Sequence, residues 1–86
     1  MERKEILEKL KPVFAWQLGV SEDDIKEDAK YAEDLGADEM DIMILTSDVE
    51  ETFGMPFNEN RLFYPSINVC TIGDSINYIQ SRLERK

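Results

Sequence analysis

Carboxylates are the main side chains in this chain that could do chemistry, and several of them gather in one short stretch. The segment AEDLGADEMDIMIL, residues 32–45, holds Asp34, Asp38, Glu39 and Asp41 in or just before a predicted helix. Paired carboxylates perform acid–base catalysis when a desolvated cleft raises the pKa of one of them. Nothing in the sequence around these acids indicates such a cleft, so we predict a binding surface rather than an active site.

The residue types that are missing exclude several functions. The 86 residues include no histidine and one cysteine, Cys70. Catalytic triads built on Ser-His or Cys-His pairs are therefore excluded, and a structural zinc site nearly so. Residues 34–45 also lack the glycine and the final glutamate of an EF-hand calcium loop. We predict no metal site and no enzymatic activity, and we expect Cys70 to be a small apolar core residue rather than a reactive thiol.

The charge of the chain indicates what kind of partner it binds. Its formal net charge is −9, which argues against nucleic acids and anionic membranes and favours proteins with basic patches. No run of about 18 apolar residues is present, so no membrane span is expected. The first ten residues lack the apolar core of a signal peptide, and a single cysteine suits a reducing compartment. We therefore predict a cytoplasmic, monomeric protein formed by one domain, residues 1–86.

Apolar residues recur every three or four positions, which predicts helices. The first helix is expected from about Glu2 to Gly19, and Pro12 lies inside it. Proline removes a backbone hydrogen bond, so either the helix kinks there or a second segment begins there, and one kinked helix is favoured. Residues 20–38 are predicted to form a long acidic loop with a short capped turn at 21–24. Tyr31 and Leu35 are expected to anchor this loop to the core, and Trp16 is expected to be a core or loop anchor.

Two further helices follow from capping signals. The second is expected to begin at Asp38 as N-cap, with Asp41 three residues on, and to end at Gly54. The last is expected to begin at Thr71, with Asp74 completing a capping box. Between them a short helix is expected at 59–63, and we expect some of the aromatic mass of Phe57, Phe63 and Tyr64 to cover the core. The predicted fold is all-α, a bundle of three to four helices with a long first loop.

Four segments of the sequence resemble one known family in order and spacing. They are QLGV (17–20), EDLGADEMD (33–41), VEETFGMPF (49–57) and TIGDSINYI (71–79), and together they span nearly the whole chain. The chain is similar to the acyl carrier proteins. This resemblance implies a 4′-phosphopantetheine arm on a serine at the start of the second helix, whose thiol holds acyl groups. It also implies synthases and transferases that read the acidic second helix with Arg and Lys.

The attachment position departs from the family pattern. The flanking residues Asp34, Gly36, Asp38 and Asp41 match, and Met40 is a mild change, but Glu39 stands where the serine is expected. The transfer reaction needs a hydroxyl, because a carboxylate would give a labile acyl phosphate. Thr46 and Ser47 lie too far into the helix to replace it. We therefore predict that no cofactor is attached to the chain as it stands.

Three interpretations of Glu39 remain open at this point. The first is neutral drift after loss of the cofactor, since an acid in a first helical turn is mildly stabilising. The second is mimicry, in which the carboxylate replaces the negative charge of the phosphodiester. The third is an engineered replacement of serine by glutamate, in which case the natural protein would be a genuine carrier. Loading at another residue would also leave the protein a genuine carrier.

The leading prediction is an acyl-carrier-protein-like module of fatty-acid, lipid or polyketide metabolism that acts by docking to other proteins. The docking surface would lie on the second helix. Met43 is the one candidate that the pattern also allows in the core. The predicted docking residues are Asp38, Asp41, Met43, Ile44, Asp48, Glu50 and Glu51.

Overall fold

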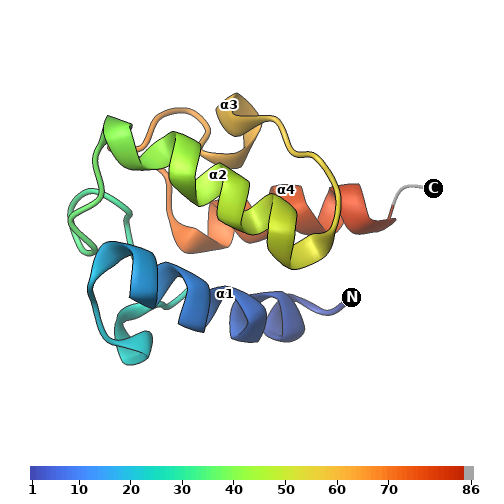
Figure 1. Ribbon diagram of the computed structural model, residues 1–86, viewed down its shortest axis with the longest axis horizontal. Coiled ribbons are helices and arrows are strands. Elements are labelled where there is room, and N and C mark those ends of the chain that lie inside the picture. The colour runs from blue at the N-terminus through green and yellow to red at the C-terminus, as the bar shows by residue number, and fades with distance from the viewer. Residues whose placement is uncertain (85–86) are drawn as a thin grey trace.

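The computed structural model describes residues 1–84, and over that range it is helical without strands (Figure 1). The elements are α1 (Arg3–Leu18), a 3-10 turn η1 (Glu22–Asp24), α2 (Glu39–Phe53), α3 (Glu59–Leu62) and α4 (Ile72–Glu84). One isolated antiparallel bridge joins Lys30 to Thr71. The all-α prediction is therefore confirmed, and so is the long loop between the first two main helices.

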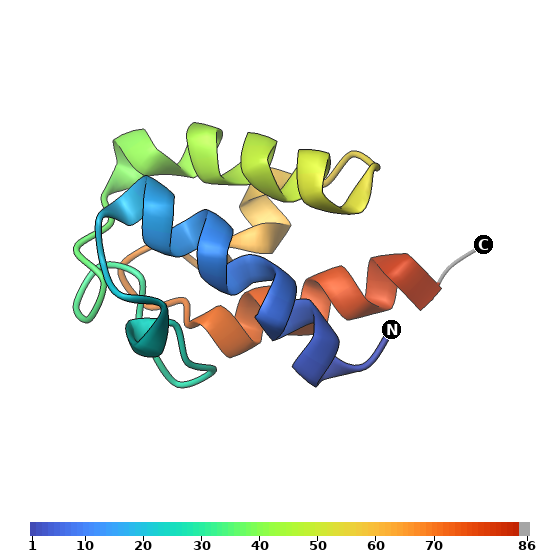
Figure 2. The same cartoon turned by 60° about the horizontal axis from the view of Figure 1, so that its bottom comes forward.

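The three long helices form a bundle in which α1 contacts both α2 and α4 (Figure 2). The short α3 packs against α2 and α4. The loop of residues 19–38 folds over the end of the bundle at which α1 ends and α2 begins (Figure 1). The start of α2 is therefore presented at one end of the molecule, whose extents are 34 × 23 × 20 Å.

The helix boundaries follow the local signals in the sequence. α1 continues through Pro12, as the single-helix interpretation predicted, and is followed by Gly19 with a left-handed φ of 70°. Gly54 follows α2 in the same conformation. α3 is one residue shorter than predicted. α4 begins directly after Thr71, as predicted, and the Thr71 hydroxyl accepts a hydrogen bond from the Asp74 N–H at 3.1 Å. The sequence ends in Arg85 and Lys86, whose positive charge is predicted to suit the C-terminal end of the last helix. Both lie outside the described residues.

The core joins the apolar faces of all the helices, and the long loop contributes to it. Tyr31 and Leu35 are buried, as predicted. The Tyr31 ring makes edge contacts with Phe14 at 5.9 Å and Phe63 at 4.9 Å between ring centroids. The other large, fully buried side chains include Ile6, Leu10, Ile25, Leu45, Val49, Leu62, Ile72, Ile76 and Ile79.

One aromatic expectation was wrong, and another is confirmed. Trp16 is 87% exposed rather than buried, because it lies two residues after the buried Phe14 and so on the opposite side of α1. Tyr64 is 65% exposed, whereas Phe57 and Phe63 of the same connection are buried and do cover the core. The aromatic surplus of this connection is therefore divided between core and surface.

Candidate functional site

The start of α2 is held by two carboxylates. Asp38 is the N-cap, and its Oδ1 accepts from the Met40 N–H at 2.9 Å. The Oδ2 of Asp41 accepts from the Asp38 N–H, also at 2.9 Å. These bonds satisfy backbone donors that a helix start leaves unpaired. The first helical residue is Glu39, whose side chain is exposed and makes no hydrogen bond among residues 1–84.

The turn before α2 fixes the direction in which this helix start faces. Asp34 Oδ2 accepts from the Lys30 N–H at 2.8 Å, and Gly36 adopts a φ of 71° that favours glycine. Ala37 is buried, and its N–H donates to the Tyr31 carbonyl at 2.8 Å. The residues that match the family pattern over 34–38 therefore shape the backbone of this turn, and the turn leaves Glu39 exposed to solvent.

An open groove of about 560 Å³ runs beside Glu39, between α2 and the segment that contains α3. Glu39 and Glu59 place two acids in its lining, and Ser66 supplies a hydroxyl from the loop that follows α3. The buried Phe63 also lines it. Its lining residues are Glu39, Ile42, Met43, Glu59, Asn60, Phe63, Tyr64, Pro65, Ser66 and Ile67.

The solvent face of α2 is apolar near its start. Met40 is 82% exposed, Met43 is 74% exposed and Ile44 is 45% exposed. The alternative that Met43 lies in the core is therefore wrong. Three neighbouring exposed apolar side chains at the start of a helix form a surface on which a partner could bury them, and methionine adapts to varied surfaces.

The predicted docking acids differ in their surroundings. Glu51 is exposed, whereas Asp41, Asp48 and Glu50 are half-buried. Glu50 is engaged inside the protein, because its Oε2 accepts from the Phe57 N–H at 2.9 Å. Partial burial, and to a lesser extent the nearby Glu51 charge, raise the pKa of Asp48. The sequence alone placed all of these acids on one docking surface of the second helix.

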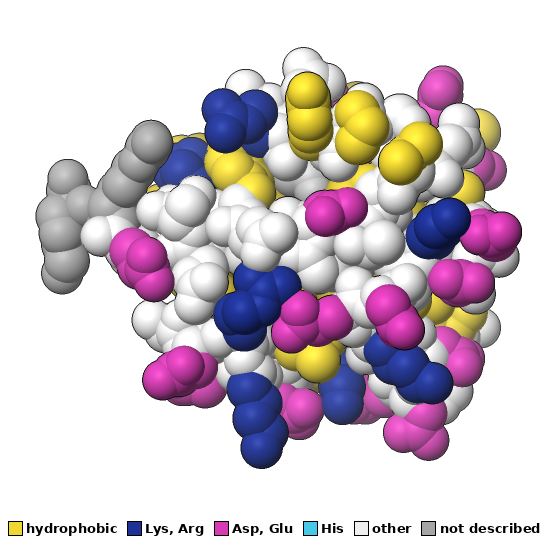
Figure 3. Space-filling view, turned by 180° about the vertical axis from the view of Figure 1, so that it is seen from behind, with side chains coloured by type: hydrophobic (Ala, Val, Ile, Leu, Met, Phe, Trp, Pro, Cys, Tyr) yellow, Lys and Arg dark blue, Asp and Glu magenta, His cyan; other side chains and the backbone are white. Residues whose placement is uncertain are grey.

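The negative charge is concentrated in the middle of the chain. No Lys or Arg occurs between Lys30 and Arg61, and nine Asp or Glu lie there, so this segment carries the whole net charge of −9. The face seen from behind the view of Figure 1 shows basic and acidic side chains interspersed (Figure 3). A partner that carries positive charge would therefore be attracted to α2 and its flanking loops rather than to the whole surface.

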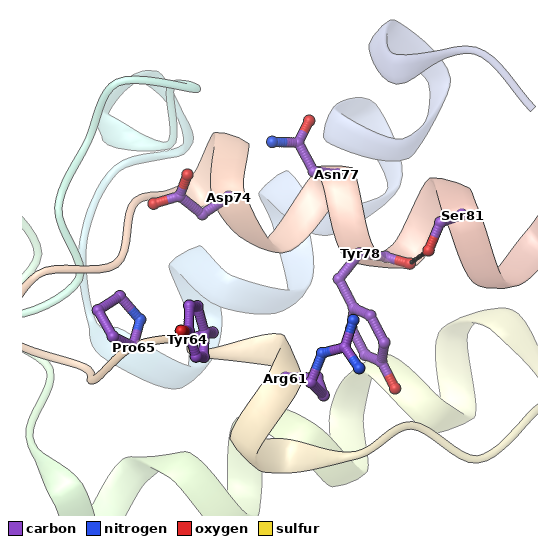
Figure 4. A pocket seen from close by; sticks show the side chains of 7 residues that line it. All are labelled: Arg61, Tyr64, Pro65, Asp74, Asn77, Tyr78 and Ser81. Carbon is purple, nitrogen blue, oxygen red and sulfur yellow. Dashed lines mark hydrogen bonds between the residues drawn. The ribbon is translucent and has the colours of Figure 1, made fainter.

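A second pocket, of about 720 Å³, lies between α4 and the α3 segment (Figure 4). The Arg61 guanidinium lies 5.6 Å from the centroid of the Tyr78 ring, and the Tyr78 hydroxyl accepts from the Asn58 N–H at 2.9 Å. These contacts hold α3 against α4. The pocket does not include Glu39. No local pattern in the sequence indicates it, because its residues come from separate segments of the chain.

Other candidate chemistries receive no structural support. Cys70 is buried with its Sγ 3.8 Å from Ser75 Oγ, and burial raises the pKa of its thiol to about 11. The expectation that it is a core residue is confirmed. Within residues 1–84 no group of three acids, histidines or cysteines is placed to hold a metal ion. None of the helices in that range has the length and hydropathy needed to cross a bilayer.

Comparison with known proteins assigns the family. The phosphopantetheine attachment site family matches residues 8–69, which include all of α2. The acyl carrier protein of Thermotoga maritima is 37% identical over 81 residues, which cover 94% of this chain and 95% of that protein. The chain belongs to the acyl carrier protein family. Its members are carriers rather than catalysts, so the family assignment also supports the prediction that the protein is not an enzyme.

Two further relatives give the same result. The acyl carrier protein of Sulfurovum sp. is 36% identical over 76 residues, which cover 88% of this chain and 96% of the relative. That of Rubrobacter xylanophilus is 33% identical over 79 residues, which cover 92% and 93% respectively. The resemblance found in the sequence is thus confirmed along nearly the full length of the chain.

Proposed function

We propose that this acyl carrier protein relative is not loaded with 4′-phosphopantetheine at the family position and works by docking to other proteins through α2. The observation that carries the proposal is Glu39, an exposed carboxylate at the first residue of α2. Its partners would be carrier-dependent synthases or transferases of fatty-acid, lipid or polyketide metabolism that bear basic patches.

The residues present do not fit the cofactor. Attachment forms a phosphodiester from a side-chain hydroxyl, and the side chain at the start of α2 is a carboxylate. The exposed hydroxyl of Ser47 lies about two turns further along the helix. Ser66 faces the same groove as Glu39 but comes from the loop after α3, outside the helix start. A transferase that recognises the start of α2 would therefore find no acceptor there.

The surface of α2 supports docking. The exposed Met40, Met43 and Ile44 offer apolar contact, and the acids of residues 31–60 have no basic residue among them. Opposite charge on a partner would steer the encounter, and buried apolar contacts would hold the complex. The fixed charge of Glu39 would stand in for the charge of a phosphodiester, so that the chain resembles a loaded carrier.

A genuine carrier in which serine was replaced by glutamate is the second candidate. The observation that favours it is the intact geometry around residue 39. The capping bonds of Asp38 and Asp41 are formed, and the adjoining groove is open. Neither capping bond involves the side chain at position 39.

Loading tests the proposal directly. The native chain, Glu39→Ser and Glu51→Ser are each incubated with coenzyme A and a broad phosphopantetheinyl transferase, then weighed. An attached arm adds about 340 Da. We expect no gain for the native chain, a gain for Glu39→Ser, and none for Glu51→Ser, the matched control that places a hydroxyl elsewhere on α2. A gain in the native chain would overturn the proposal.

Mimicry is tested by affinity for a carrier-dependent synthase. Glu39→Gln removes the charge and keeps the size of the side chain. At low salt we expect binding to weaken by about two- to fivefold, the usual effect of one exposed charge. Equal affinities of the two chains would remove the mimicry interpretation and leave neutral drift and the engineered replacement.

A further inference from the structure

Trp16 lines a further groove, which lies beside α2 and is distinct from the two pockets described above. This groove has a volume of about 470 Å³, lies between α1 and α2, and shares no residue with the groove beside Glu39. The indole is 87% exposed, more than any other large apolar side chain among residues 1–84. The lining consists of Pro12, Val13, Trp16, Gln17, Asp48, Glu51 and Thr52.

The chemistry of this groove is that of a site for a cation. Its only charged lining residues are Asp48 and Glu51, and neither forms an ion pair within residues 1–84. Indole is the aromatic group that attracts cations most strongly across its face. Burial and the Glu51 charge already raise the pKa of Asp48, so a cation between the two acids would relieve their repulsion.

We propose that this groove receives an arginine side chain of a protein partner, with the guanidinium over the Trp16 indole and hydrogen-bonded to Asp48 or Glu51. A planar guanidinium both stacks on an aromatic face and pairs with a carboxylate, whereas a lysine ammonium is a compact, strongly hydrated charge. Pro12 and Val13 give the groove an apolar wall for the arginine methylenes.

The net charge of the surrounding segment fits this occupant. Asp48 and Glu51 belong to the stretch between Lys30 and Arg61, which has no basic residue. The inference rests on the proposed docking function, since the arginine would belong to the same basic partner. It extends the contact surface from α2 onto α1.

Intrinsic fluorescence tests the site, because Trp16 is the only tryptophan. The probes are three blocked peptides of equal length, which alternate alanine with arginine, lysine or citrulline. We expect a saturable change with the arginine peptide, a weaker one with lysine, and none with citrulline, which keeps the shape without the charge. Asp48→Asn and Glu51→Gln should each weaken arginine binding by about two- to fivefold.

Control variants separate this site from general attraction to an acidic protein. Asp23→Asn removes one exposed charge in η1 and should leave the affinity unchanged. Trp16→Ala, followed by calorimetry, should weaken arginine binding while helicity stays native, because the side chain is exposed. The proposal is overturned if the peptide leaves Trp16 fluorescence unchanged. It is also overturned if Asp23→Asn weakens binding of the arginine peptide as much as Asp48→Asn does. The same holds if the free chain buries Trp16 against a second copy in solution.

The two proposals fail in different ways. Met40→Ser alters the apolar start of α2 without touching the Trp16 groove. If Met40→Ser leaves the affinity for the synthase unchanged while the arginine peptide still binds at Trp16, the proposed docking function is wrong and the proposed arginine site is supported. If Met40→Ser weakens synthase binding but the arginine peptide does not change the Trp16 fluorescence, the proposed arginine site is wrong and the proposed docking function is supported.

Discussion

The hydroxyl of Tyr31 is a point at which removal of one atom should measurably loosen the fold. It donates to Ser75 Oγ at 2.7 Å, and the Ser75 hydroxyl donates to the Leu62 carbonyl at 2.6 Å. This buried chain joins the long loop to α4 and α3. Tyr31→Phe removes the donor and keeps the ring, including its edge contacts with Phe14 and Phe63.

The loss of unfolding free energy in Tyr31→Phe depends on which hydrogen-bonding groups lose their partners. An intramolecular hydrogen bond contributes about 0.5–1.5 kcal/mol, and a buried polar group that loses its partner adds to the loss. Ser75 still donates to Leu62, so only its acceptor side is affected, and the Cys70 sulfur lies 3.8 Å away as a weak substitute. We expect the free energy of unfolding to fall by about 1–2 kcal/mol, and each kcal/mol corresponds to about 4–8 °C in Tm.

Urea unfolding followed by far-ultraviolet circular dichroism measures this difference. Helix content is the better signal, because Trp16 is exposed already in the folded state. The matched control is Tyr64→Phe, since Tyr64 is 65% exposed and its hydroxyl forms no hydrogen bond among residues 1–84. If the two variants lose the same stability, the buried chain contributes nothing and the reasoning is refuted. In a Ser75→Ala background the Tyr31→Phe loss should shrink, because the two residues are coupled.

Three further predictions concern the core and the α1–α2 groove. Because its pKa is raised to about 11, the Cys70 thiol should resist a thiol reagent at about pH 8 in the native protein and react in urea, and equal rates would contradict its burial. The raised pKa of Asp48 means that its contribution to stability falls as pH rises through that pKa. Asp48→Asn should therefore unfold at an equal or higher urea concentration than the native chain at neutral pH, with a smaller difference in acid, and a lower neutral midpoint would contradict this. Gly73→Ala should destabilise by about 1–3 kcal/mol in thermal melts, because its Cβ would lie 2.9 Å from the Glu27 carbonyl oxygen, and an unchanged Tm would show that the loop yields.

The sequence alone determined the helices and the position of the candidate site. Apolar spacing and capping residues act within a few positions along the chain, so Asp38 and Asp41 marked the start of α2 and Gly54 its end. The same local pattern placed Glu39 at the first helical residue. Tyr31 was expected to be buried, but its hydroxyl partner Ser75 lies 44 residues away and only the packing of the loop on α4 brings them together.

The tertiary structure alone decided what surrounds each side of α2. The sequence treated Asp48, Glu50 and Glu51 as one acidic face, but Glu50 is bound to the backbone of Phe57, and Asp48 and Glu51 line a groove against α1. Trp16 was expected to be a core or loop anchor, but it is exposed and lines the same groove. Periodicity shows which residues share a face of a helix. It does not show whether another helix covers that face or leaves it exposed, because packing between helices depends on contacts between segments far apart in the chain.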